Sequence, residues 1–234
     1  MSEIIRIDLN GVNSYLAKCE GGFILFDTGG HLVLDQKFTN RRELLLKAIE
    51  TAGCTLDTLK LIVLTHGDND HSCNAAYLRD HSNAKIAMHD SDRGLVEYPT
   101  LQKWMESYQY SSTEMQHMFL QYKDGITKIT QKTLDEFERF SPDILLKDGS
   151  SLAPYGLNAI VIHVPGHTKG SIAILTENGE LISGDTFVNN EKPGPSPNAT
   201  DFPKLADSID KLKGLAIETV YPGHGTPFGF NELI

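Results

Sequence analysis

The sequence has few cysteines, no strongly basic segment and no long apolar run, and each absence excludes a class of protein. Its three cysteines, Cys19, Cys54 and Cys73, form no close pair, which is poor material for a disulfide framework and fits a reducing cytoplasm. The net charge of −10 argues against a nucleic-acid partner, because phosphates are bound by clustered Lys and Arg. The apolar stretches are far shorter than the ~20 residues that span a bilayer. Residues 1–7 lack the apolar block of a signal peptide, so we expect a cytoplasmic protein with no membrane partner.

What is present is typical of a globular protein. A chain of 234 residues can form one large α/β domain or two small ones. Residues 90–143 differ from the rest, because aromatic and apolar residues recur there at helical intervals, the last series running from Leu134 to Phe140. We predict a helical insertion over 90–143. Such apolar stripes are more often local core, although an insertion between two strand-rich halves is well placed to roof an active site.

The most informative stretch follows a short apolar strand, Leu61–Leu64, and carries His66, Asp68, Asp70 and His71. In an extended loop His66 and Asp68 point the same way, because they are two residues apart. Asp70 and His71 are adjacent and must diverge, which suits two neighbouring metal ions better than one. The alternative is a polar strand-to-helix loop in which the acidic residues serve as caps and turn formers.

Polar side chains also follow other predicted strands. His167 lies in a turn after the strand that ends at Val164, and Asp185 closes a strand predicted over 180–183. His224 lies in a turn, 222–227, after a last strand predicted over 216–221. Sites collect at strand ends in layered α/β sheets, and four imidazoles with three carboxylates suffice to coordinate two metals and leave room for water.

Asp27 directly follows the predicted strand Gly22–Phe26, and Thr28 and two glycines come after it. Its carboxylate could hydrogen-bond a metal-ligating histidine and steady it. An ordinary Asx turn explains the same pattern equally well.

These motifs resemble the metallo-β-lactamase superfamily of metallohydrolases, whose signature is His-x-His-x-Asp-His followed by a lone His, a lone Asp and a final His. The matching segments are Thr65–His71, Pro165–Ser171, Ser183–Thr186 and Tyr221–Gly225, with Asp27–Gly29 as the early strand end. The resemblance covers essentially the whole chain. It implies an α/β fold, a four-layered αββα sandwich formed by a single domain over 1–234.

By this resemblance His66 and His167 would hold one metal, and Asp70, His71 and His224 would hold a second, with Asp185 bridging the two. The departure is Asp68, which stands where the family usually has its second His. We expect two divalent metal ions, with zinc favoured. A carboxylate at this position hardens the first site and brings iron or manganese into consideration.

The resemblance implies a binuclear metal-dependent hydrolase of the lactonase or glyoxalase II-like branch. Its substrate would be a small molecule with an ester-like bond (a lactone, thioester or carboxylic ester), attacked by a metal-bridging hydroxide. Asp70 and Asp185 are the predicted catalytic residues, as proton carriers. Asp185 argues against antibiotic hydrolysis, because the family's β-lactamases generally lack it. The alternatives are a di-iron redox enzyme, suggested by Asp68, and a non-catalytic metal-binding sensor. The aromatic insertion could also form the contact of a homodimer.

Overall fold

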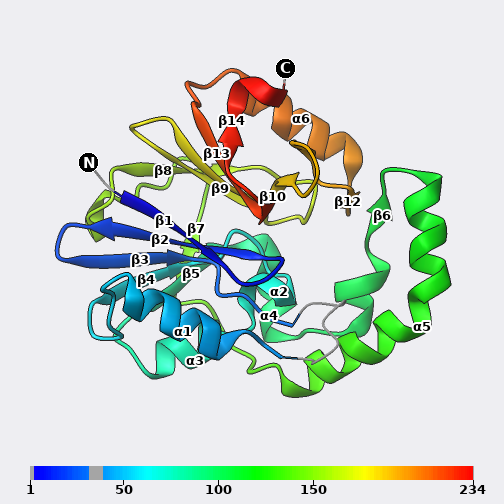
Figure 1. Ribbon diagram of the computed structural model, residues 1–234, viewed down its shortest axis with the longest axis horizontal. Helices are drawn as coiled ribbons and strands as arrows, with labels where there is room; N and C mark the ends of the chain where they lie inside the picture. Colours follow the sequence, from blue (N-terminus) through cyan, green and yellow to red (C-terminus); the bar gives the residue numbers. More distant parts are fainter. Residues whose placement is uncertain (1–2, 32–38, 234) are drawn as a thin grey trace.

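The computed structural model describes residues 3–31 and 39–233, which form two packed β-sheets with helices on both outer faces (Figure 1). The first sheet contains, in spatial order, β1 (Glu3–Asp8), β2 (Asn13–Cys19), β3 (Gly22–Phe26), β4 (Leu59–Val63), β5 (Lys85–His89) and β7 (Ile144–Leu146). The second contains β14 (Phe228–Gly229), β13 (Thr219–Gly225), β10 (Glu180–Asn189), β9 (Ile172–Thr176) and β8 (Ala159–His163), and β11 (Gly194–Pro195) pairs with β10. Strands β3, β4, β5 and β7 are parallel.

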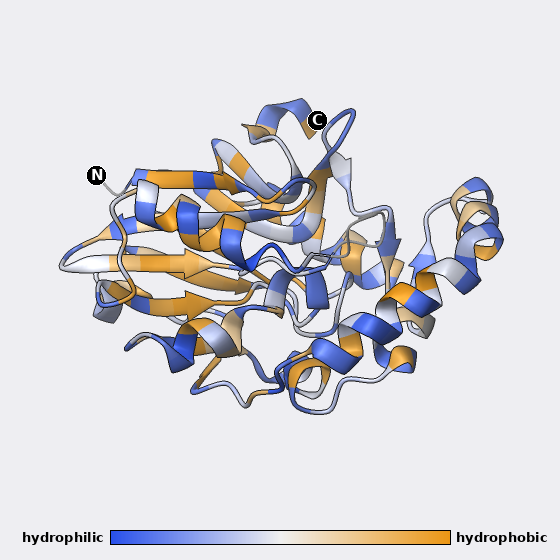
Figure 2. Ribbon diagram, turned by 60° about the horizontal axis from the view of Figure 1, so that its bottom comes forward, coloured by the Kyte–Doolittle hydropathy of each residue, from blue (hydrophilic) through white to orange (hydrophobic). Residues whose placement is uncertain are grey.

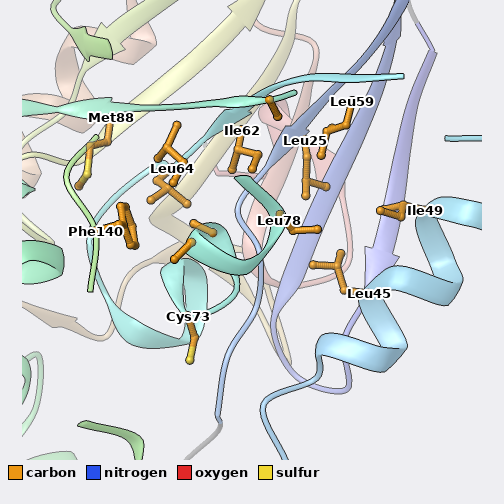
Figure 3. Close-up of a cluster of buried hydrophobic side chains, with 14 of the residues drawn as sticks. Leu25, Leu45, Ile49, Leu59, Ile62, Leu64, Cys73, Leu78, Met88 and Phe140 are labelled. Atoms are coloured by element: carbon orange, nitrogen blue, oxygen red, sulfur yellow. The ribbon is translucent and has the colours of Figure 1, made fainter. Parts of the chain in front are cut away.

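Alternation of side chains along the strands builds the layers. Ile24 and Phe26 of β3 are fully buried between the two sheets, whereas Leu25 points to the opposite face. There Leu25 packs with Leu45 and Ile49 of α1 (Arg42–Thr51), as Figure 3 shows. Helix α3 (Ala75–Asp80) packs into the same cluster.

The outer face of the second sheet is covered by α6 (Phe202–Lys213), whose Leu212 joins a third apolar cluster. Asp201 caps this helix, because its carboxylate accepts a hydrogen bond from the Lys204 backbone N–H at 3.0 Å. The order of layers is therefore helix, sheet, sheet, helix, which confirms the predicted αββα sandwich.

Two predicted strand ends were wrong. The strand expected to end at Ser183 continues as β10 to Asn189, so Asp185 lies inside a strand rather than after one. Gly184, with φ of 49°, forms an irregularity at which the register with β13 shifts, so the glycine bends the strand without ending it. Likewise β13 runs through Pro222 to Gly225, where we predicted a turn. Strand β14 pairs only with Thr219 and Val220, so Pro222 lies where β13 is an edge strand.

The 90–143 segment connects β5 to β7 and is mainly helical. It contains a 3-10 turn (Asp90–Asp92), α4 (Arg93–Glu97), a π-helical turn (Gln102–Glu106), β6 (Gln109–Tyr110) and the long helix α5 (Thr113–Glu136). β6 pairs with β12 (Asn198–Ala199), and α5 projects away from the sheets (Figures 1 and 2). No helix in the described ranges is long and apolar enough to span a bilayer.

The last helix of this segment ends earlier than we predicted. Phe137 and Phe140 follow α5 in non-helical chain, and both are buried in the cluster beneath the first sheet. Their helical spacing was misleading, because an irregular segment can direct both rings into the same core. Trp104 contacts Phe137 edge-on, with ring centroids 5.1 Å apart, so these aromatics form local core.

Candidate metal centre

The structure brings the predicted ligands together from both sheets. The short helix α2 (Asn69–Ser72) follows β4 and carries Asp70 and His71, while His167 follows β8. Asp185 and His224 come from neighbouring strands, β10 and β13. Ligand atoms lie within 4.8 Å of one another in three groups, of which two share no residue: His66, His167 and Asp185; and Asp70, His71 and His224. The third group, Asp27, His66 and His71, overlaps with both.

In all four histidines Nδ1 is hydrogen-bonded within the protein and Nε2 is the nitrogen left for the centre. Nδ1 of His71 donates to the Asp27 carboxylate at 2.9 Å, and Nδ1 of His167 donates to the Asn198 carbonyl at 3.0 Å. Nδ1 of His224 lies 2.5 Å from the Gly11 carbonyl. A carbonyl can only accept, so Nδ1 carries a proton, and Nε2 is the ring nitrogen that faces the centre and offers its lone pair to a metal once it is deprotonated.

His66 follows the same arrangement through a hydroxyl. Its Nδ1 lies 2.9 Å from Thr65 Oγ1, and Thr65 Oγ1 in turn donates to Asp27 Oδ2 at 2.7 Å. Asp27 therefore contacts His71 directly and His66 through Thr65, beyond the single hydrogen bond that we predicted for it.

Asp185 lies between the two groups. Its carboxylate oxygens are 3.1 Å from Nε2 of His224, 3.3 Å from Nε2 of His71 and 3.7 Å from Nε2 of His167. Gly223 makes this approach possible, because a Cβ at that position would lie 1.9 Å from Asp185 Oδ1. The carboxylate is thus within reach of ligands from both groups.

The charges at the centre are matched to cations. Burial and the charge of His71 lower the pKa of His66 to about 4. Burial opposes protonation of His224, but the charge of Asp185 outweighs it and raises the pKa of His224 to about 9. Among the described residues, His66 Nε2, Asp68 Oδ1 and Asp185 Oδ1 are buried without a hydrogen-bond partner. Buried donors and acceptors rarely stay unpaired, so these atoms fit a bound metal.

Asp68 turns into the first group. It occupies the N-cap position of α2 but makes no capping hydrogen bond with its side chain. Instead Asp68 Oδ2 lies 3.2 Å from His167 Nε2 and 3.6 Å from His66 Nε2, and it accepts a hydrogen bond from the Tyr108 hydroxyl. Sequence reasoning missed Tyr108, because nothing in the aromatic spacing of the insertion separates it from core residues.

The centre opens into a cavity of about 320 Å³. Trp104 and Tyr108 of the insertion line this cavity together with Asp68, Asp70, His167, Asp185 and His224. Tyr108 also lines a second cavity of about 350 Å³, together with Leu95 and Thr168. Cys73 belongs to none of the three groups of ligand atoms; its thiol is free and buried, 3.8 Å from His31 Nδ1.

Two hydrolases are similar to this chain in sequence. The probable metallo-hydrolase YflN of Bacillus subtilis is 28% identical over 194 residues, which cover 72% of this chain and 65% of YflN. The hydroxyacylglutathione hydrolase of Francisella tularensis is 33% identical over 87 residues, 36% of this chain and 34% of that protein. These matches thus span less than two thirds of either relative.

A solved structure shows the same fold. A metallo-beta-lactamase family protein of Thermus thermophilus superimposes with a TM-score of 0.69 over 97% of this chain and 74% of the other, at 22% identity. The sequence profile of the Metallo-beta-lactamase superfamily matches residues 7–224. The chain therefore belongs to the metallo-β-lactamase superfamily.

Proposed function

We propose that this protein is a binuclear metal-dependent hydrolase of an ester-like bond in a small molecule: a lactone, a thioester or a carboxylic ester. The observation that carries the proposal is the convergence of four Nε2 atoms, each fixed by a hydrogen bond at Nδ1, around the Asp185 carboxylate. Membership of a metallohydrolase superfamily supports hydrolysis. The partial similarity to a hydroxyacylglutathione hydrolase supports the lactonase or glyoxalase II-like branch.

We assign the metal ligands from the two groups of side chains. His66, Asp68 and His167 would hold one divalent cation, and Asp70, His71 and His224 the other, with Asp185 shared. Two such cations would supply an activated water and would polarise the carbonyl of the substrate. Zinc suits the imidazole ligands, and Asp68 keeps iron and manganese as alternatives.

The protein's own groups would orient the substrate and move protons. Burial raises the pKa of Asp70, which favours proton uptake by this carboxylate, and Asp70 Oδ2 lies 3.5 Å from His224 Nε2. Burial, together with the charge of Asp68, raises the pKa of Tyr108 well above its usual value, so the phenol stays a donor. The two cavities that Tyr108 lines are of a size to take the organic part of a small substrate.

A substrate panel tests the proposal. Protein with verified metal content is assayed against carboxylic esters, lactones, thioesters and phosphodiesters, with chelator-treated protein as the control. We expect turnover of at least one of the first three classes and its loss on chelation. Inactivity towards all of them, or cleavage of phosphodiesters alone, would contradict the proposal.

A di-iron redox enzyme is the second candidate, and Asp68 is the observation that favours it. A carboxylate within 3.2 Å of His167 Nε2 makes the first group a harder set of ligands than an additional imidazole would. Metal analysis of protein purified without added metal separates the two candidates. Stoichiometric zinc without iron would rule out the redox enzyme.

A further inference from the structure

A buried carboxylate outside the predicted ligand set connects the two loops of the first metal group. Asp92 ends the 3-10 turn that follows β5, and its side chain is 1% exposed. Its Oδ2 accepts hydrogen bonds from the Gly67 backbone N–H at 3.0 Å and from the Thr168 hydroxyl at 2.6 Å. Its Oδ1 accepts from the Gly170 backbone N–H at 2.7 Å. Both oxygens therefore accept hydrogen bonds from within the protein.

The partners of Asp92 stand next to the proposed ligands. Gly67 lies between His66 and Asp68, which follow a strand of the first sheet. Thr168 directly follows His167, which lies between strands of the second sheet. One carboxylate thus fixes two loops that come from different sheets and carry ligands of the same proposed metal.

At Gly170 the loop lies so close to Asp92 that only glycine fits. A Cβ at Gly170 would lie 2.6 Å from Asp92 Cγ and 2.7 Å from its Oδ1. Any side chain at this position would push the carboxylate out of its place. Thr168 is also held from its other side, where its hydroxyl lies 2.7 Å from that of Ser171. The loop is therefore built around the carboxylate.

We propose that Asp92 is a positioning residue that fixes the distance between the His66–Asp68 loop and His167, and so sets the metal affinity of the first group. This inference rests on the proposed metal centre. The second group, Asp70, His71 and His224, has no hydrogen bond to Asp92 in the described residues. Loss of Asp92 should therefore weaken one of the two metal sites selectively.

The substitution Asp92→Asn tests the proposal. The amide keeps the shape of the side chain but replaces one acceptor by a donor, which then faces either Gly170 N–H or the Gly67 N–H and Thr168 hydroxyl pair. Titration with Co²⁺, followed by absorbance and by competition with a chelator, should show two binding steps in the unmodified protein. We expect one step to weaken about 10- to 100-fold in Asp92→Asn, as for other groups that orient metal ligands.

A spectroscopic signature identifies the affected site. In the Co²⁺-loaded protein, ring N–H protons of coordinated histidines give strongly shifted NMR signals. Asp92→Asn should lose or broaden the signals of His66 and His167 and keep those of His71 and His224. Asp143→Asn is the matched control, because Asp143 Oδ2 also accepts a backbone N–H, that of Ile86 at 2.8 Å, away from the ligands. It should leave both steps unchanged.

Thr168→Val removes a single hydrogen bond to Asp92 and decides the outcome if Asp92→Asn does not fold. It should weaken the same step by a smaller factor, and combining it with Asp92→Asn should add little. Equal weakening of both steps, or no change in either, would overturn the positioning role. Absence of metal binding by the unmodified protein would instead contradict the proposed function, so the two failures are distinguishable.

Discussion

The charge arrangement around Asp185 can be tested without substrate, by measuring the stability of chelator-treated Asp185→Asn protein. Asp185 is 8% exposed, and its Oδ2 lies 3.1 Å from His224 Nε2. Burial alone would lower the pKa of His224, but Asp185, with a smaller contribution from the charge of Asp70, raises this pKa to about 9. Relative to the ordinary value of 6.5, the pKa difference corresponds to about 3 kcal/mol of stabilisation of the folded state.

The sign of the pH dependence follows from the direction of this shift. Because the folded-state pKa of His224 lies above the unfolded value, its stabilisation is complete below pH 6.5 and is lost as the pH rises through about 9. The free energy of unfolding of Asp185→Asn should therefore fall below that of the unmodified protein by up to about 3 kcal/mol near pH 6. The difference should shrink as the pH rises through about 9, where His224 loses its proton.

Urea unfolding in the presence of a chelator, repeated across this pH range, measures the difference. Asp143→Asn serves as the control, because Asp143 is also an aspartate that accepts a backbone N–H, that of Ile86, and among the described residues it forms no ion pair with His224. A difference for Asp185→Asn that is constant with pH, or that grows as the pH rises, would refute the assigned His224–Asp185 pairing.

Three further predictions concern the centre itself. Metal binding should release protons near pH 7 and tighten as the pH rises to about 9, because His224 must lose its proton. Calorimetry in buffers of different ionisation enthalpy measures the number of protons released, and the absence of proton release would contradict the prediction. Tyr108→Phe removes the hydroxyl that donates a hydrogen bond to Asp68, and it should lower kcat/KM about 10-fold while the metal content stays unchanged. Unaltered kinetics would exclude a role for this hydrogen bond. Asp27→Asn weakens the partner of His71 Nδ1 and should reduce metal affinity about 10- to 100-fold by chelator competition; unchanged affinity would make Asp27 a turn residue only.

The layers of the fold and the gathering of the predicted ligand side chains at one place were largely readable from the sequence. Short apolar strands that end in histidine or aspartate beside glycine specify where side chains gather, because strand ends in layered sheets share an edge. Asp185 shows the limit of this reading. We expected the strand to end at Ser183, but Gly184 forms a bulge after which pairing with the neighbouring strand continues, and local sequence does not separate the two cases.

The supporting residues of the centre could not be predicted. Tyr108 bonds to Asp68 across 40 residues, and Asp92 bonds to Thr168 across 76 residues. Neither residue carries a local motif, and each depends on how the insertion folds over the sheets. Phe137 and Phe140 illustrate the same point for the core, because tertiary packing rather than helical periodicity determines where their rings lie.

Anomalous diffraction from crystals grown with zinc tests the central claim most directly. We predict a pair of peaks, one contacted by His66 and His167 and the other by His71 and His224, with Asp185 contacting both. A single peak, or peaks that Asp185 does not touch, would contradict a binuclear centre bridged by this carboxylate.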